Sequence, residues 1–153
     1  MTEFDKLEQQ YVEIDSQYAQ LEFNAARRGW SKKEESLQAK RKQNDEAYFL
    51  FMFSRLEDRI RQESSKLIIK MQGSPRSYRT VSAWITLPPN PEDDIPFKRR
   101  LALLIQKHTT DYQMICKYYD HRNSIAHGGH FVSNIAMPSS ILEFKRLNRL
   151  LQA

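Results

Sequence analysis

The sequence predicts an all-α protein: a helical bundle of four to five helices with a long proline-rich loop between the second and third helices. Apolar residues recur at steps of three and four in four segments, which is the spacing of one helix face. Glycine occurs only four times in 153 residues, so the turn signals of β-hairpins are nearly absent. The length suits one hydrophobic core, and we expect a single domain over residues 1–153.

The first expected helix carries an apolar seam with alternating steps of three and four. Its members are Phe4, Leu7, Tyr11, Ile14, Tyr18, Leu21 and Ala25. This heptad pattern predicts that the helix packs lengthwise on a partner helix. Gly29 then suits a helix end, and Ser31 suits the cap of the next helix.

A long second helix is expected from Ser31 or Asn44 to Gln72, where the segment "GSP" at 73–75 stops it. Its apolar stripe reads Phe49, Met52, Phe53, Leu56, Ile60, Leu67 and Met71. Residues 74–97 should form the long loop, because four of the six prolines fall between 88 and 96 and a helix interior does not tolerate proline. A short extended piece is expected at 81–87.

A third helix should begin at Phe97 and break near "HTTD" at 108–111, where two threonines and an aspartate favour a new cap. Its stripe reads Leu101, Leu104, Ile105, His108, Tyr112, Ile115 and Tyr119. The last helix is expected to begin at Ser140, which stands three residues before Glu143 as in a capping box.

Charge and cysteine content narrow the class of protein. Residues 1–26 carry a net charge of −5 and residues 27–153 a net charge of +10, which favours a polyanionic partner as much as a merely solvated basic surface. A single cysteine, Cys116, excludes an intramolecular disulfide and fits a reducing cytoplasm. The longest apolar run, "YFLFMF" at 48–53, is too short to span a bilayer. We therefore expect a cytoplasmic protein that does not enter the membrane.

The segment "YYDHRNSIAHGGHF" at 118–131 holds three of the four histidines. Asn123 and His127 are four residues apart and share one helix face. Arg122 offers a planar fork of donors for a phosphate, and a histidine exchanges protons near neutral pH. A phosphate clamp beside an acid–base group is enough to cleave RNA, since the 2′-hydroxyl supplies the nucleophile. No cluster of metal ligands is visible, and no cofactor is expected.

The string "RNSIAHGG" resembles the R-x4–6-H signature of the HEPN superfamily (higher eukaryotes and prokaryotes nucleotide-binding domains). It maps that signature onto Arg122 and His127 as catalytic residues, with Asn123 in support. The segment "FMFSRLEDRI" at 51–60 resembles the family segment that brings an acidic or polar residue to the motif, which would be Glu57 with Ser54 nearby. Where nucleotidyltransferase-paired toxins carry a tyrosine, this chain has Gly129, which argues against control by nucleotidylation there.

The resemblance implies a helical-bundle, metal-independent endoribonuclease, often a toxin or antiphage effector, that leaves a 2′,3′-cyclic phosphate. It also implies RNA as substrate, an antitoxin or other regulatory partner protein, and a homodimer with the two motifs apposed. We expect exposed apolar surface around Phe51 and Tyr118 to supply the hydrophobic part of that interface.

Structural roles are the simpler explanation for most other candidates. His121 and His130 should be solvent-exposed, with substrate contact the less favoured role, and His108 should be hydrogen-bonded and partly buried. Core packing is expected for Cys116, and anchoring by packing for Trp30 and Trp84.

Two rival functions stand beside the nuclease. One is a catalytically silent HEPN-like module that uses the first helix and the Arg–His face to bind a partner protein or a nucleotide. The other is a coiled-coil adaptor, which leaves the histidine-rich turn unexplained.

Overall fold

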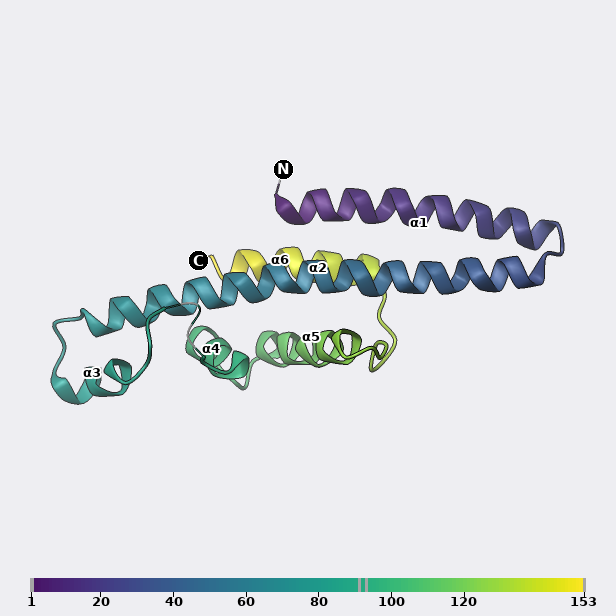
Figure 1. Cartoon of the computed structure of the whole chain (residues 1–153). Coiled ribbons are helices and arrows are strands. Elements are labelled where there is room, and N and C mark those ends of the chain that lie inside the picture. Colours follow the sequence, from purple (N-terminus) through teal and green to yellow (C-terminus); the bar gives the residue numbers. More distant parts are fainter. Residues whose placement is uncertain (1, 91, 93, 153) are drawn as a thin grey trace. The chain divides into compact units, whose positions relative to one another are not determined.

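The computed structural model of the chain describes residues 2–90, 92 and 94–152, and within them it contains six α-helices and no strand (Figure 1). The helices are α1 (Glu3–Arg27), α2 (Ser31–Gln72), α3 (Tyr78–Ile85), α4 (Phe97–Leu104), α5 (Thr110–Ala126) and α6 (Met137–Leu150). The all-α prediction is confirmed. The described residues form six helices instead of the expected four to five, because the expected loop contains α3.

The chain divides into two compact units. The first comprises Met1–Phe53 and Asp120–Lys145, and the second comprises Ser54–Tyr119 and Arg146–Ala153. The helices α2, α5 and α6 therefore each contribute residues to both units. The expectation of a single domain stays a prediction.

In the first unit, α1 runs back alongside the first part of α2, as the heptad seam predicts (Figure 1). The Tyr11 hydroxyl donates to Asp45 Oδ1 at 2.8 Å. Arg41 forms ion pairs with Asp15 and with Glu22, both at 2.9 Å. The hydrogen bonds to these carboxylates raise the pKa of Arg41, and the bond from Arg41 lowers the pKa of Glu22. The seam side chains Phe4, Tyr11 and Ala25 are buried, whereas Leu21 is 47% exposed and does not belong to the buried seam.

A cluster of phenylalanines forms the core of the first unit. Phe49 and Phe53 on α2 are fully buried and contact Phe144 on α6, whose ring also stacks on Phe4 of α1 at 6.4 Å. The adjacent Lys145 forms ion pairs with Asp5 and Glu8 on α1. Its hydrogen bond holds the pKa of the Asp5 carboxyl below its ordinary range. One side of α6 is thus fixed to α1 by both ring and charge contacts.

The expected start of the last helix at Ser140 is wrong. The helix begins at Met137, and the Ser140 N–H donates to Ala136 O as an ordinary helical bond. Ser140 itself is 4% exposed, so its hydroxyl faces the interior and does not form a cap at the surface. Pro138 in the first turn lacks an N–H that would be unsatisfied there, which suits an earlier start.

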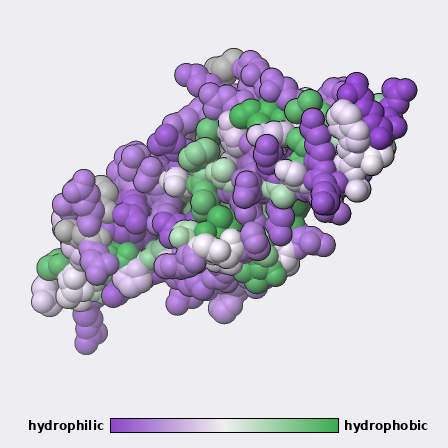
Figure 2. Space-filling view, turned by 45° about the vertical axis from the view of Figure 1, so that its right-hand side comes forward, coloured by the Kyte–Doolittle hydropathy of each residue, from purple (hydrophilic) through white to green (hydrophobic). Residues whose placement is uncertain are grey.

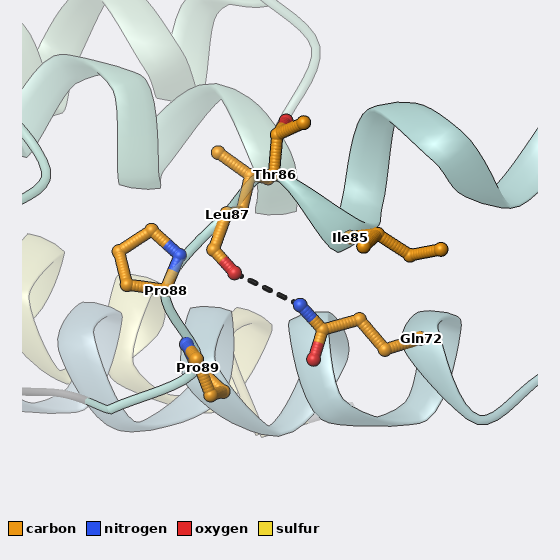
Figure 3. A pocket seen from close by; sticks show the side chains of 6 residues that line it. All are labelled: Gln72, Ile85, Thr86, Leu87, Pro88 and Pro89. Atoms are coloured by element: carbon orange, nitrogen blue, oxygen red, sulfur yellow. Dashed lines mark hydrogen bonds between the residues drawn. The ribbon is translucent and has the colours of Figure 1, made fainter.

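In the second unit, α3 occupies residues that were expected to be loop and partly extended. Val81 and Trp84 are three apart on its inward face, and Trp84 packs against a cluster of Ile68, Leu87 and Ile95. The Gln72 amide donates to Trp84 O at the end of α3 and to Leu87 O just after it, both at 2.8 Å, which satisfies these carbonyls. Figure 3 shows the bond to Leu87. This capping from α2 allows a helix of eight residues to persist.

The rest of the expected loop is held by Arg100 of α4, which is 2% exposed. Its guanidinium donates to the hydroxyls of Ser64 and Ser65 on α2 and to Asn90 O, each at 3.1 Å.

The expected break near 108–111 is confirmed: α4 ends at Leu104, and the Thr109 hydroxyl accepts from Tyr112 N–H ahead of α5. His108 lies in this break and is exposed, so its expected partial burial is wrong. Pro91, one of the loop prolines, lies outside the described residues.

The face drawn in Figure 2 is mostly hydrophilic, with hydrophobic residues exposed at intervals. Among the described residues, no helix combines the length and the apolar character needed to cross a membrane.

Asp45 gives the first unit a testable pH dependence. Burial raises the pKa of Asp45, against the hydrogen bond from Tyr11, which lowers it. Because the folded protein binds this proton more tightly than the unfolded chain does, the ionised carboxylate destabilises the fold at neutral pH. This destabilisation disappears as the pH falls through the raised pKa. The variant Asp45→Asn keeps an acceptor for Tyr11 without the charge, so thermal unfolding should show a Tm higher by about 2 °C at pH 7. The gain should shrink towards pH 4.

The matched control is Asp15→Asn, which weakens the ion pair with Arg41 and should lower the Tm at pH 7. A lower Tm for Asp45→Asn at pH 7, or a gain that is independent of pH, would contradict this account of the buried carboxyl.

Candidate functional site

The candidate site lies where α5 ends, within the first unit. Gly128 adopts a φ of +83°, a left-handed conformation that glycine favours, and its N–H donates to Ile125 O at 3.0 Å. The Gly129 N–H donates to Ser124 O at 2.9 Å. These two bonds form a Schellman motif, in which His127 is the last residue of the helical turn. A left-handed glycine thus ends α5.

Gly129 is required for close approach. A Cβ at this position would lie 2.9 Å from both the carbonyl and the hydroxyl oxygen of Ser124. The same hydroxyl donates to His130 O at 2.6 Å. The chain therefore turns back against the end of α5, and residues 130–133 are positioned beside it.

His121 is a core residue, and its expected exposure is wrong. Its ring is 1% exposed and contacts Phe49 and Phe131 edge to face. Nδ1 accepts from the Val132 N–H at 3.0 Å, so a neutral ring carries its proton on Nε2, which lies 3.5 Å from the Ser133 hydroxyl. The helical spacing already held the signal, because His121 stands three residues after Tyr118, which is also buried.

His130 is exposed, as predicted, but one of its nitrogens is held. Nδ1 lies 2.8 Å from Glu46 Oε1, and the side chain of Glu46 is 9% exposed whereas that of His130 is 66% exposed. A buried carboxylate thus orients an exposed imidazole and leaves its other nitrogen towards solvent. The sequence interpretation missed Glu46, although it stands three residues before Phe49 on the buried face of α2.

Arg122 and Asn123 lie near the end of α5, and His127 directly follows its last residue. The Arg122 guanidinium donates to Asn123 Oδ1 at 3.0 Å, and both side chains are half-buried. The His127 N–H donates to Asn123 O at 3.1 Å, so the helical spacing that places these two on one face is retained. The His127 side chain is exposed, and within the described part of the chain no group bonds to its ring.

The remaining predicted residues belong to the second unit. Glu57 is buried and accepts from Arg61 at 3.1 Å, and Ser54 is exposed. Their support of the Arg122 motif stays a prediction. Tyr118 is 5% exposed and cannot provide surface for an interface, so that expectation is wrong; Phe51, in the first unit, is 54% exposed as expected.

Three further expectations were structural. Trp84 packs beside the Ile68 cluster, in agreement with its expected packing role, whereas Cys116 is only half-buried and does not belong to the buried core. Trp30 is 47% exposed, so it is not the packing anchor that the sequence suggested. Over residues 2–90, 92 and 94–152, no group of three His, Cys, Asp or Glu side chains is arranged to hold a metal ion.

No protein-family model matches the chain, and neither a curated protein nor a solved structure is similar to it.

The two histidines of α5's end should differ sharply in their effect on stability. His121→Ala removes a buried ring from between Phe49 and Phe131, and should lower the free energy of unfolding by about 2–4 kcal/mol. His127→Ala removes an exposed, unbonded ring, and should change it by less than about 0.5 kcal/mol. Urea denaturation followed by circular dichroism measures both, with the exposed His108→Ala as a control. Equal losses for His121→Ala and His127→Ala would contradict the assignment of these positions.

Proposed function

We propose that the chain is a metal-independent endoribonuclease of the HEPN type that acts in the cytoplasm as a toxin or antiphage effector. The observation that carries the proposal is the state of His127. Of the three histidines around the end of α5, His121 is buried and hydrogen-bonded, and His130 is bonded to Glu46. His127 is exposed, five residues after Arg122, and among the described residues no group bonds to its ring. An exposed imidazole without a hydrogen-bond partner is available to a substrate, whereas a histidine that stabilises the fold would be bonded or buried.

The reaction needs two proton transfers and one stabilised charge. The 2′-hydroxyl loses a proton and attacks phosphorus, the 5′-oxygen leaves with a proton, and the products are a 2′,3′-cyclic phosphate and a 5′-hydroxyl. Arg122 would stabilise the charge that develops on the phosphate oxygens. His127 would transfer one of the protons.

His130 is suited to contact the substrate and to transfer the other proton. Its Nδ1 bond to the buried Glu46 fixes the orientation of the ring and leaves Nε2 available. Asn123 has a positioning role, because its amide oxygen holds the Arg122 guanidinium on the face that also carries His127. Under the same proposal, Glu57 and Ser54 support the motif, and an antitoxin or regulatory protein keeps the nuclease inactive.

Loss of either motif residue should abolish RNA cleavage. The variants Arg122→Ala and His127→Ala should each reduce cleavage of total RNA by about 10²-fold or more, because each removes a phosphate clamp or a proton carrier. His130→Ala should slow the reaction without abolishing it. Purified proteins are incubated with total RNA in EDTA, and the products are separated on denaturing gels.

Cleavage by wild type in EDTA is expected. Full activity in either motif variant, or loss of wild-type cleavage on chelation, would refute the proposal. RNA that is bound but not cleaved by wild type would identify the catalytically silent module instead.

We propose further that the active form is a homodimer with the Arg122–His127 faces apposed. A two-fold axis at this face would bring two arginines and two histidines together, since an isologous interface pairs the same patch from both chains. Phe51, on α2 of the same unit, is 54% exposed, and under this proposal its ring would supply apolar area to the interface. Sedimentation velocity at micromolar concentration should show a dimer, and Phe51→Asp should shift it towards monomer and lower the cleavage rate about tenfold. A folded monomer with full activity would contradict the apposed faces.

A further inference from the structure

A second functional surface lies at the turn that joins α1 to α2. We call residues 23–33 the hairpin tip; their sequence, "FNAARRGWSKK", contains four cationic residues and no acidic residue. This composition contrasts with that of residues 1–22, which hold six carboxylates and one lysine. A strongly positive segment therefore follows directly on an acidic helix.

Two aromatic rings are exposed at the hairpin tip. Phe23 is 57% exposed and Trp30 is 47% exposed. The Arg28 guanidinium lies 4.9 Å and the Lys33 ammonium 5.2 Å from the centre of the Trp30 ring, and the Arg27 guanidinium lies 5.8 Å from the centre of the Phe23 ring. Each ring is thus an exposed flat surface with cations at its edge or face.

The cations of the hairpin tip are not neutralised. Arg27, Arg28, Lys32 and Lys33 are all exposed, and in the described part of the chain none of them forms an ion pair with a carboxylate. Arg41, farther along α2, binds both Asp15 and Glu22. The acidic side chains of α1 are therefore used elsewhere, and the positive charge at the tip remains open to a partner.

The backbone holds this surface in place. Gly29 adopts a φ of +67°, and the Trp30 N–H donates to Ala25 O at 3.0 Å, which closes the end of α1 tightly. The Trp30 carbonyl in turn accepts from the Lys33 and Glu34 N–H groups, at 3.0 Å each, at the start of α2. The positive end of the α2 dipole adds to the charge of the side chains. Trp30 is presented by a fixed turn between two helices.

We infer that the hairpin tip is a docking surface for single-stranded RNA, in which Trp30 and Phe23 stack on unpaired bases and the four cations contact phosphates. Proteins that bind single-stranded nucleic acid without sequence preference combine aromatic side chains, which stack on bases, with cationic side chains, which contact the phosphates. A bilayer is a poorer partner, because the tip exposes two rings bordered by charge and no aliphatic side chain larger than that of Ala26, whereas an interfacial helix needs a continuous apolar face. The surface is separate from Arg122 and His127, and only the choice of RNA over DNA rests on the proposed function.

The binding experiment uses full-length His127→Ala protein, so that no cleavage occurs, and a fluorescent, unstructured 12-nucleotide RNA followed by anisotropy. Trp30→Ala in this background should weaken binding about five- to 150-fold, which corresponds to the loss of one stacked base. Phe23→Ala should weaken it as well. Tyr78→Ala is the matched control, because Tyr78 is 79% exposed, adjoins Arg79 and lies outside the tip. It should leave the Kd unchanged.

Salt dependence tests the phosphate contacts separately. The double variant Arg27→Ala with Arg28→Ala should reduce the slope of log Kd against log salt by about 1.4, since each phosphate contact to a single strand contributes about 0.7. Trp30→Ala should leave this slope nearly unchanged. Quenching of tryptophan fluorescence on RNA addition should be lost in Trp30→Phe.

An unchanged Kd for Trp30→Ala, or an equal loss for Tyr78→Ala, would overturn the inference. So would binding to phosphatidylserine vesicles that depends on Trp30 while RNA binding does not. If wild type fails to cleave RNA but binding depends on the tip as described, the proposed nuclease fails and this inference stands. If wild type cleaves and Trp30→Ala binds normally, only this inference fails.

Discussion

The backbone reversal at Gly128 and Gly129 is the constraint on which the candidate site depends. Gly128 supplies a positive φ, and Gly129 has no Cβ to collide with Ser124. The reversal ends α5 at a fixed place and returns the chain so that the Val132 N–H reaches the buried ring of His121. A side chain at position 128 would have space but would be strained by the positive φ, and one at position 129 would collide with Ser124. The segment from His127 to Ser133 follows this turn.

That turn gives three neighbouring histidines three different roles. His121 faces the phenylalanine core and accepts a backbone hydrogen bond, which makes it part of the fold. His130 is oriented by the buried Glu46, and His127 is left exposed at the C-terminal end of the helix. His121 therefore serves the fold, one nitrogen of His130 is held by Glu46, and under the proposed function His127, Arg122 and the other nitrogen of His130 would carry the chemistry.

Helical periodicity predicted the architecture because burial follows spacing along a helix, and the α1 seam and the α2 stripe were found in this way. The break before α5 was found from its capping residues. It missed α3 because that helix is held by Gln72, a partner distant in sequence. The start of α6 was misplaced because Ser140 looks like a cap but is buried. At the site, the motif located Arg122 and His127, whereas the burial of His121 and the role of Glu46 depend on which face each helix turns inward.

The 3′ ends of the cleaved RNA test the central claim most directly. If Arg122 and His127 promote attack by the 2′-hydroxyl, mass spectrometry of RNA digested by wild-type protein in EDTA should find 2′,3′-cyclic phosphate ends paired with 5′-hydroxyl ends. The same digestion with His127→Ala should yield neither. Fragments that end in a 3′-hydroxyl, which require water or another external nucleophile, or cyclic phosphate ends that persist in His127→Ala, would contradict the account.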